Sequence, residues 1–442
     1  MYWLEERSGR RWRRWHCTLS SDPTTETLRR LRVLCVSDVY FPRVNGVSTS
    51  IRTFRTDLAA AGVDSVLVAP AYPSDATQTT TRIDDNKQLR RVPSSGVPGD
   101  PEDRRMHWRA LRRTLEQLDG RFDLVHVQTP FLAHYAGVGF ARRHALPVIA
   151  TYHTLFEEYL HHYVPLLPRS IGGALARRFT RSQCAQLQAL VAPSEAMREL
   201  LRAYGVSSRI EVIPTGLPPE CYRPGDGARF RARFNLPSDR RLLLYVGRVA
   251  FEKNIEFLLR MFVAVRRARS NAALVIAGEG PAQARLRALA SELGIGADVH
   301  FIGYLEREQE LPDCYAAADV FVFASRTETQ GLVLLEALAQ GRPVVSTAHM
   351  GTASVLQADG GARIVPEQVE PFAQAVLEVL GDSALAAQLH EQAARYAQSW
   401  ASVRMAQRLA ALYRELTEGQ GSGAGADAAP QSVLPTGASE NG

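Results

Sequence analysis

Two cationic side chains lie five positions apart in the run 247–254. Arg248 and Lys253 both belong to this run, which directly follows the apolar stretch 242–246. Lys253 is one of only two lysines among the 52 Lys and Arg residues of the chain. Its ammonium is a compact point charge, whereas the guanidinium group of arginine is a planar fork, so the two are not interchangeable. The pair therefore predicts a site for a polyanionic group such as a diphosphate.

Two carboxylates, Glu328 and Glu336, lie eight positions apart at a second strand-to-helix turn. The helix is expected to begin near Leu332, and apolar neighbours place Glu336 in a nearly buried position. A buried carboxylate needs partners, which the vicinal hydroxyls of a ribose would supply. The N–H groups that follow Gly331 could meet a diphosphate. A solvent-facing glutamate or a partner of the helix dipole is the alternative. Together with the two cations, this arrangement predicts a nucleotide-sugar site.

Two glycine turns are weaker signals of phosphate binding. Gly46 lies in the turn after the first expected strand, where backbone N–H groups can approach phosphate at a helix N-terminus. Gly278 and Gly280 follow a later strand, but Gln283 stands where a complete GxGxxG motif would have its third glycine. Either turn could hold glycine for its geometry alone. Both therefore support the nucleotide-sugar interpretation without deciding it.

His153 directly follows the apolar run 147–152. A polar residue at the carboxyl end of a parallel strand points into the cleft of an open α/β sheet. His153 could bond a sugar hydroxyl or shape the donor conformation, or it could be a hydrogen-bonded structural histidine, and its protonation state cannot be assigned from sequence. His161 and His162 follow without a nearby carboxylate or cysteine to complete a ligand set. No metal site is predicted.

Alternating strands and helices must position these residues. Apolar runs suited to buried parallel strands occur at 31–39, 65–69, 124–127, 147–152, 189–192 and 210–213. A second series occurs at 242–246, 273–277, 299–302, 320–324 and 343–346. Helical stretches such as 51–61, 255–269 and 282–293 separate them. Two such series joined by a Pro- and Gly-rich segment predict two doubly wound α/β domains that face one another across a ligand-binding cleft.

The expected domain limits follow from these two series. The first domain is expected over residues 30–216 and the second over 217–398. A helix over 399–418 is expected to pack back on the first domain. The compositions of 1–29 and 419–442 are typical of disordered tails.

Composition excludes several classes of protein. The 442 residues are 45% hydrophobic and 22% charged, which is ordinary for a soluble globular protein. No run approaches the roughly 18 apolar residues needed to span a bilayer, and no secretory leader is recognisable. The five scattered cysteines indicate reduced thiols in a cytoplasmic protein. The net charge of +6 suits an acidic membrane surface or phosphorylated substrates, and no nucleic-acid-binding motif is present.

Two basic segments suggest contact with a membrane. The arm 10–15 combines arginine with tryptophan, and a helix is expected over 106–118. The arginines of the second segment are Arg104, Arg105, Arg109, Arg112 and Arg113. The alternative for the arm 10–15 is a disordered tail. The alternative for the helix 106–118 is a solvated basic helix that covers the domain. If the membrane interpretation holds, the protein would lie peripherally on the inner face of the plasma membrane.

These motifs together resemble glycosyltransferase family 4, whose members have the GT-B fold. The resemblance extends over about residues 31–416, and its specificity comes from combining the run 247–254 with Glu328 and Glu336. It implies a retaining, metal-independent transfer of a hexose from a nucleoside-diphosphate sugar, which is a co-substrate and not a cofactor. The implied catalysis is electrostatic, with same-face attack and with the departing phosphate taking the acceptor proton.

The resemblance also implies a role for each motif residue. Arg248 and Lys253 would neutralise the diphosphate, Glu336 would hold the ribose, and Glu328 would hold the donor sugar near its C3 and C4 hydroxyls. The remaining implied positions are Gly46 at the phosphates, His153 beside the donor sugar, and Ser194, Thr215 and Gly216 at the inner ends of N-terminal strands.

One departure bears on the acceptor. Many members have Gly-Gly in the first loop, where this chain has Asn45 and Gly46, which leaves the details of phosphate contact open. This form, with Tyr152-His153-Thr154 and the Glu- and Tyr-rich run 157–163, is similar to the branch that glucosylates diacylglycerol. We therefore expect a membrane lipid or glycolipid acceptor and a UDP-glucose donor, with GDP-mannose as the other candidate.

Two other functions fit the same motifs. A nucleotide-sugar epimerase shares the two-domain architecture, and it would give products without an acceptor. A non-catalytic nucleotide-sugar-binding protein is the second alternative, and a donor-hydrolysis assay separates it from an enzyme. The presence of all four charged motif residues favours an enzyme.

Overall fold

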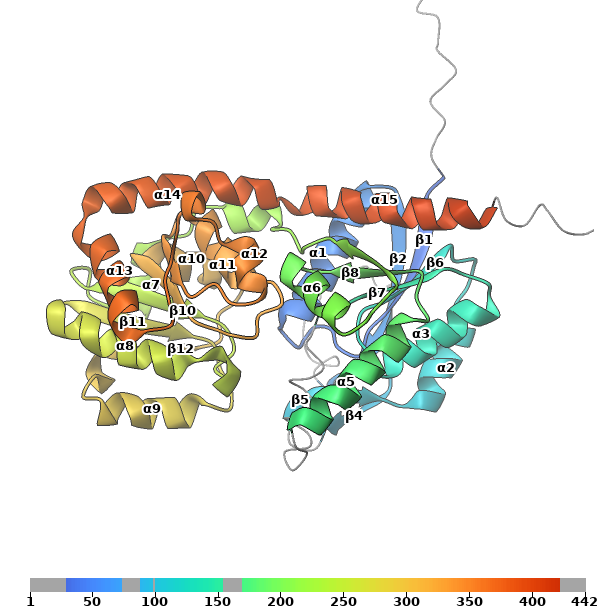
Figure 1. The fold of residues 1–442 in the computed structure, drawn as a ribbon, viewed down its shortest axis with the longest axis horizontal. Helices are drawn as coiled ribbons and strands as arrows, with labels where there is room; N and C mark the ends of the chain where they lie inside the picture. The colour runs from blue at the N-terminus through green and yellow to red at the C-terminus, as the bar shows by residue number, and fades with distance from the viewer. Residues whose placement is uncertain (1–28, 74–87, 98–99, 154–168, 422–442) are drawn as a thin grey trace, which may run out of the picture.

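A computed structural model describes residues 29–73, 88–97, 100–153 and 169–421. The chain forms two α/β lobes that lie side by side (Figure 1). Each lobe has a parallel sheet covered by helices, so the prediction of two doubly wound domains is confirmed. The predictions for 1–28, for the Tyr-rich run after His153 and for the last 21 residues lie outside the described residues.

The N-terminal lobe contains a seven-stranded parallel sheet in the order β3-β2-β1-β6-β7-β8-β9. The strands are β1 (Leu31–Val36), β2 (Val63–Pro70), β3 (Leu89–Val92), β6 (Leu124–Val127), β7 (Val148–Thr151), β8 (Ala189–Ala192) and β9 (Arg209–Val212). Both faces of β1 are buried, with Leu34 and Val36 in one cluster and Val33 and Cys35 in another. Such a strand is a mostly apolar run, interrupted here by Arg32, which is why it could be found from sequence.

Helices cover both faces of this sheet. They are α1 (Gly46–Ala60), α2 (Trp108–Glu116), α3 (Leu132–Arg143), α5 (Arg169–Cys184) and α6 (Glu195–Ala203). An antiparallel hairpin of β4 (Ser94–Val97) and β5 (Asp100–Met106) precedes α2. Helix α1 begins at Gly46, five residues before the expected start, because the Asn45 side chain accepts a hydrogen bond from the Ser48 N–H at 2.8 Å.

The C-terminal lobe contains a six-stranded parallel sheet in the order β12-β11-β10-β13-β14-β15. Its strands are β10 (Arg241–Val246), β11 (Ala272–Ala277), β12 (Val299–Gly303), β13 (Val320–Phe323), β14 (Val344–Ser346) and β15 (Ala362–Ile364). Its α-helices are α7 (Gly227–Arg233), α8 (Ile255–Ala268), α9 (Gln283–Glu292), α10 (Glu310–Ala317), α11 (Leu332–Ala339), α12 (Gly351–Val355), α13 (Val369–Gly381) and α14 (Ser383–Ala397). Short 3-10 helices are η2 (Pro219–Tyr222), η3 (Phe251–Lys253), η4 (Gly296–Asp298), η5 (Ala358–Gly360) and η6 (Gln398–Trp400).

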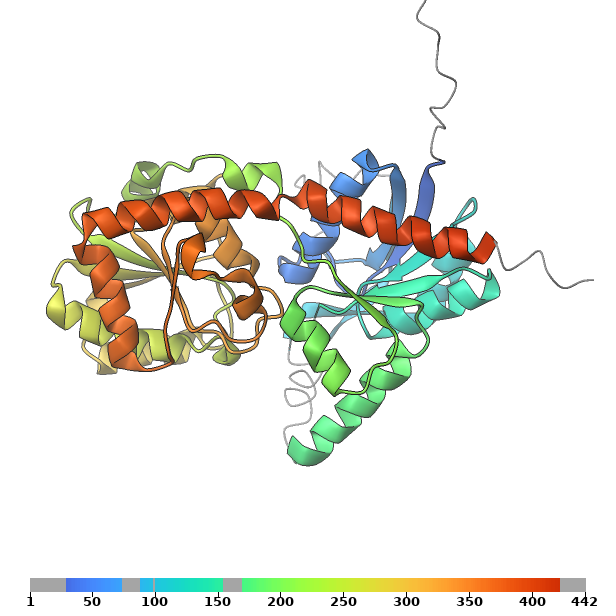
Figure 2. The same ribbon diagram turned by 45° about the horizontal axis from the view of Figure 1, so that its top comes forward.

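The chain crosses between the lobes twice. Helix α14 ends the C-terminal lobe and α15 (Ser402–Gly421) continues over the N-terminal lobe, as both ribbon views show (Figures 1 and 2). Backbone hydrogen bonds join the first crossing, at Leu217, to the second, at Trp400 and Ser402. Leu217 N–H donates to the Trp400 carbonyl at 2.7 Å, and Ser402 N–H donates to the Leu217 carbonyl at 2.9 Å. Helix α15 packs against α1, and its Tyr413 is fully buried.

Sequence patterns missed three parts of the sheets. Strand β3 is an edge strand with two arginines among its four residues, and β15 has only three residues. The hairpin β4–β5 carries polar and charged side chains rather than an apolar run. Short or edge strands bury little apolar surface, so periodicity gives no signal for them. Among the described helices, none is long and apolar enough to cross a bilayer.

Candidate functional site

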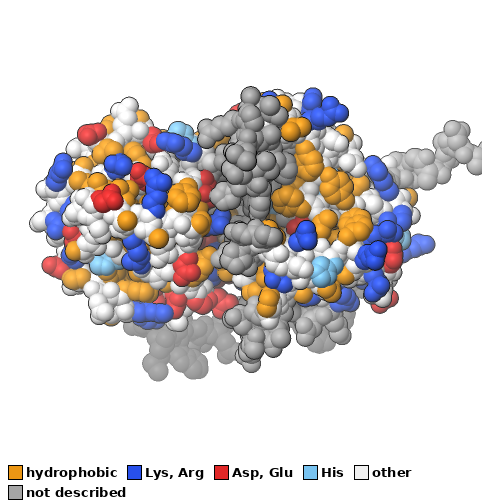
Figure 3. Space-filling view, turned by 90° about the horizontal axis from the view of Figure 1, so that it is seen from below, with side chains coloured by type: hydrophobic (Ala, Val, Ile, Leu, Met, Phe, Trp, Pro, Cys, Tyr) orange, Lys and Arg blue, Asp and Glu red, His pale blue; other side chains and the backbone are white. Residues whose placement is uncertain are grey.

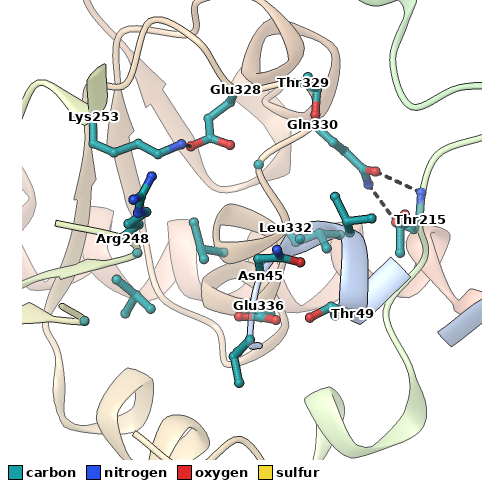
Figure 4. A pocket seen from close by; sticks show the side chains of 18 of the residues that line it. Asn45, Thr49, Thr215, Arg248, Lys253, Glu328, Thr329, Gln330, Leu332 and Glu336 are labelled. Carbon is teal, nitrogen blue, oxygen red and sulfur yellow. Dashed lines mark hydrogen bonds and ion pairs between the residues drawn. The ribbon is translucent and has the colours of Figure 1, made fainter. Parts of the chain in front are cut away.

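A cavity of about 460 Å³ lies between the two lobes. The carboxyl ends of several strands border it, because Gly46 follows β1, His153 follows β7, and Gly278 follows β11. Such ends are where open α/β sheets bind ligands. The cavity also brings together Arg248, Lys253, Glu328, Gly331, Leu332 and Glu336. The structure thus gathers the predicted donor-site residues around one space, and Figure 4 shows the charged ones among them. Ser194, Gly216 and Gly280, which the sequence also singled out, do not line it.

Lys253 and Glu328 form an ion pair at one side of this cavity (Figure 4). Lys253 Nζ donates to Glu328 Oε1 at 2.6 Å, and both side chains are about four-fifths shielded from solvent. Burial alone would lower the pKa of Lys253, but the attraction of Glu328 and the hydrogen bond prevail, so the pKa is raised. Lys253 therefore stays charged, and the pair can offer a cation and a hydrogen-bond acceptor to one ligand.

Arg248 enters the same cavity from the loop after β10. Its guanidinium lies 4.0 Å from Glu252, one helical turn along the chain. The fully buried Tyr245 donates its hydroxyl hydrogen to the Arg248 carbonyl at 3.1 Å, which fixes the backbone of this loop. The two cations of the run 247–254 thus reach one cavity from a loop anchored in the core.

Glu336 is the fifth of the eight residues of α11 and is only 4% exposed. Its Oε1 accepts a hydrogen bond from Arg307, and its Oε2 accepts one from the Tyr315 hydroxyl at 2.9 Å. The sequence argument assigned no protein partner to this carboxylate and required ribose for that role. The structure corrects that argument, because two protein groups already satisfy the charge. Arg307 follows the carboxyl end of β12, so its position in the sequence could have suggested a role at the site. Nothing in the sequence suggests such a role for Tyr315.

Gly278 and Gly331 are required by backbone geometry. Gly278 has φ +128°, and a Cβ atom there would lie 2.0 Å from the Gly247 carbonyl oxygen. Gly331 has φ +87° and directly precedes α11, whose residues Leu332 and Val333 line the cavity. Left-handed backbone of this kind favours glycine. Gly278 therefore lets its loop lie against the loop that carries Arg248, and Gly331 allows the left-handed turn that precedes α11.

Gly46 differs from these glycines. A Cβ atom at Gly46 would meet no protein atom within 4 Å, and its φ is not in the left-handed region. Packing within the protein therefore does not require glycine at this position. Because Gly46 begins α1 and lines the cavity, the open space beside it faces the ligand region.

His153 is a neutral histidine with fixed partners. Burial lowers the pKa of His153 to about 4. Its Nε2 lies 3.0 Å from Gln128 Oε1, and its carbonyl accepts a hydrogen bond from the Thr329 hydroxyl of the other lobe at 3.0 Å. Gln128, which the sequence did not single out, orients the ring. A neutral imidazole suits hydrogen bonding to a hydroxyl better than neutralising a phosphate.

Gln330 clamps the two lobes together beside the cavity (Figure 4). Its amide accepts from the Thr215 N–H at 2.8 Å and donates to the Thr215 carbonyl at 2.7 Å. The Thr215 hydroxyl lies 2.6 Å from that of Ser50 on α1. The sequence did not predict a role for Gln330, because a single glutamine in a turn belongs to no recognisable motif.

The residues that the resemblance placed at the inner ends of N-terminal strands also have structural roles. Ser194 caps α6 by accepting from the Met197 N–H at 3.3 Å. A Cβ atom at Gly216 would lie 2.4 Å from the Ser402 Cα atom, so this glycine allows the two crossings to touch. Thr215 is held by the clamp.

The N-terminal half of the cavity contains a further ion pair that sequence reasoning missed. Arg43 lies 2.5 Å from Asp103 of β5, and both side chains line the cavity with Val44. This pair joins the first loop to the hairpin. Among the described residues, no group of three His, Cys, Asp or Glu side chains could hold a metal ion.

Comparison with known proteins identifies the family. Residues 44–220 match the family Glycosyltransferase Family 4, and residues 226–399 match the family Glycosyl transferases group 1. The chain is 35% identical over 330 residues to the alpha-monoglucosyldiacylglycerol synthase of Streptococcus pneumoniae, covering 72% of this chain and 71% of that one. It is 31% identical over 327 residues to a GDP-mannose-dependent alpha-mannosyltransferase of Mycobacterium tuberculosis, covering 72% and 79%.

A solved structure shows the fold. Sucrose-phosphate synthase from Thermosynechococcus elongatus superposes with a TM-score of 0.71 at 22% identity, covering 88% of this chain and 100% of that one. The predicted GT-B fold is confirmed. Fold, family matches and relatives agree, and the chain belongs to glycosyltransferase family 4 and is a glycosyltransferase.

Proposed function

We propose that this glycosyltransferase transfers a hexose, with retention of configuration, from a nucleoside-diphosphate sugar to a hydroxyl group of a membrane lipid or glycolipid. UDP-glucose is the favoured donor and GDP-mannose the other candidate. The observation that carries the proposal is the interlobe cavity of about 460 Å³, in which two cations, two carboxylates and the start of α11 converge.

Each group has a distinct proposed task at the donor. Arg248 and Lys253 offset the negative charge of the diphosphate, which grows as the bond between the sugar C1 and the phosphate oxygen breaks. The N–H groups at Gly331 and Leu332, and Gly46 from the other lobe, approach the phosphates. Gly278 keeps the loop of Arg248 in place.

The remaining groups hold the two sugars of the donor. Glu336 accepts from the ribose hydroxyls, and Glu328 accepts from the transferred hexose. His153 lies beside that hexose as a neutral hydrogen-bonding group. The acceptor oxygen attacks C1 from the face that the phosphate leaves, and the departing phosphate takes the acceptor proton, so no covalent enzyme nucleophile is needed.

The donor assignment draws on the relatives. One relative at 35% identity is named for glucosyl transfer to diacylglycerol, and another at 31% identity for mannosyl transfer from GDP-mannose. The higher identity favours a glucose donor. A thermal-unfolding screen of UDP-, GDP- and ADP-sugars tests it, because a ligand of the native state raises stability by RT ln(1 + [L]/Kd).

Product analysis tests the reaction class. Incubation with the stabilising donor and diacylglycerol-containing vesicles should give glycolipid and free nucleoside diphosphate. Isomerised nucleotide sugar without glycolipid would support an epimerase instead. Binding without any product would support a non-catalytic protein.

Exchanging each carboxylate for its amide should separate their tasks. Glu336→Gln should weaken binding of the free nucleotide and of the nucleotide sugar alike, because both contain ribose. Glu328→Gln should leave free-nucleotide binding nearly unchanged and weaken only the nucleotide sugar. Calorimetric titration of each variant with both ligands measures this, with the exposed Glu292→Gln on α9 as the control. Equal losses for both ligands in both variants would contradict the division of roles.

The lipid acceptor predicts binding to anionic membranes. Helix α2 buries Leu111 and Leu115 and exposes Trp108. Arg105, Arg109 and Arg112 are exposed beside it. Seen from below, the N-terminal lobe has apolar side chains interspersed with basic ones (Figure 3). Each basic side chain near an anionic surface contributes about 1 kcal/mol, and salt screens it.

Reversing the charges of Arg105, Arg109 and Arg112 together should therefore weaken binding to anionic vesicles at low salt by roughly tenfold or more, while hydrolysis of the soluble donor is spared. Vesicle co-sedimentation measures this. The matched control reverses Arg260, Arg267 and Arg395, which are exposed on the C-terminal lobe. The acceptor proposal fails if the unmodified protein binds neither neutral nor anionic vesicles and glycosylates only water-soluble acceptors.

A further inference from the structure

Glu336 lies in the wall between two cavities. The second cavity, of about 360 Å³, lies between α1, η2 and α10. It shares Thr49, Arg307, Leu311 and Glu336 with the interlobe cavity. The carboxylate is therefore accessible to a ligand from one side and to protein side chains from the other.

Of the two partners of Glu336, Arg307 lines both cavities and Tyr315 lines the second. Burial alone would lower the pKa of Arg307, but attraction to Glu336 and the hydrogen bond prevail and the pKa is raised, so the guanidinium stays charged. Burial, and then the charge of Glu336, raise the pKa of Tyr315 well above its ordinary value, so its hydroxyl stays a donor. Both partners thus present permanent donors to the carboxylate.

Other ionisable groups around Glu336 do not replace these partners. Cys221 of η2 is neutral, because burial, reinforced by the charge of Glu336, raises the pKa of its thiol to about 12. Arg52 of α1, Glu220 of η2 and Glu308 line the second cavity. Among the described cations, Arg307 is the one hydrogen-bonded to Glu336.

We propose that Arg307 and Tyr315 are positioning residues that hold the Glu336 carboxylate aimed at the ribose of the donor; this inference rests on the nucleotide-sugar site proposed above. Each carboxylate oxygen has two lone pairs. Arg307 occupies one on Oε1 and Tyr315 occupies one on Oε2. One lone pair remains on each oxygen, which matches the two vicinal hydroxyls of a ribose.

The test compares a nucleotide with its form that lacks both ribose hydroxyls. The first probe is UDP or GDP, whichever of the two the unmodified protein binds. The second probe is the 2′,3′-dideoxy form of that nucleotide. The unmodified protein should prefer the ribonucleotide. Arg307→Met, which removes the charge and keeps the bulk, should reduce that preference by about 10- to 100-fold, the range for a hydrogen bond to a charged group. Tyr315→Phe should reduce it by about 3- to 10-fold, and Arg307→Lys should restore part of it.

The ratio of the two affinities isolates the ribose contact. Phosphate and base contacts are common to both probes, so general loosening of the site would weaken both equally and leave the ratio unchanged.

Matched controls come from the same lobe. Arg229 forms a two-pronged ion pair with Asp313 on α10, the helix that carries Tyr315, and neither residue lines either of the two cavities described above. Tyr396 donates its hydroxyl hydrogen to the Val355 carbonyl at 2.7 Å. Arg229→Met and Tyr396→Phe should keep the ribose preference. Thermal unfolding of each variant checks that it folds.

The possible outcomes separate this inference from the proposed function. If the unmodified protein binds neither nucleotide, the proposed function fails. If it binds one and Glu336→Gln abolishes the ribose preference while Arg307→Met and Tyr315→Phe retain it, the nucleotide site stands and the positioning role is overturned. Loss of the preference in both variants, with partial rescue by Arg307→Lys, supports the inference.

Discussion

Lys253→Ala should lower kcat/KM by about 30- to 1000-fold. This corresponds to a loss of roughly 2–4 kcal/mol of transition-state stabilisation, the scale for losing one electrostatic stabiliser. The structure adds a second reason for a large effect. Lys253 Nζ lies 2.6 Å from Glu328, so its loss leaves an unpaired carboxylate beside the departing diphosphate. Lys253→Arg should also be impaired, because a planar fork cannot replace a point charge in a closed site.

Steady-state kinetics with the donor identified by thermal unfolding measure these losses. Arg260→Ala is the control, because Arg260 is exposed on α8 and pairs with Glu256 away from the cavity. Near-normal turnover in Lys253→Ala would remove the diphosphate role from this residue. The family assignment would be unaffected.

Gly278→Ala should reduce the free energy of unfolding by roughly 3–5 kcal/mol, which combines backbone strain with overpacking. The new Cβ would lie 2.0 Å from the Gly247 carbonyl oxygen at a φ of +128°, so the two loops would have to separate. Because Gly247 directly precedes Arg248, donor affinity should fall with stability. Urea denaturation and nucleotide titration measure the two effects.

Gly294→Ala provides the matched control for this substitution. Gly294 also has positive φ, at +71°, but a Cβ atom there would meet nothing within 4 Å. Only the left-handed conformation is then penalised, at about 1–2 kcal/mol. Equal losses in the two variants would mean that the close approach of the loops does not matter.

Sequence predicted the central strands and the charged motifs for the same physical reason. Strands β1 and β10 are buried on both faces and are therefore mostly apolar, apart from Arg32 in β1 and Arg241 at the start of β10. The motif residues lie in the loops and helices that follow such strands. Arg248, Glu328 and Glu336 could be placed because the carboxyl ends of parallel strands meet at one edge. The edge strand β3 offered no comparable pattern.

The supporting residues were not predicted, since they act through contacts between distant segments. Arg307 reaches Glu336 across 29 positions, Gln128 reaches His153 across 25, and Gln330 reaches Thr215 across 115. Each is a common residue type in a segment without periodicity. Only the folded arrangement shows that they orient the residues that the motifs supply.

Helix α15 has a consequence for how the protein is made. Its residues Met405, Leu409 and Tyr413 complete a core cluster that otherwise belongs to the N-terminal sheet, and Tyr413 bonds the buried His126 at 2.7 Å. Translation delivers these residues only after the whole second lobe. The N-terminal lobe, although first to leave the ribosome, therefore carries an uncovered apolar face through most of synthesis, and its closing contact spans 287 positions. Contacts of such long range form slowly, and the interval before they form is when a nascent chain is most open to aggregation.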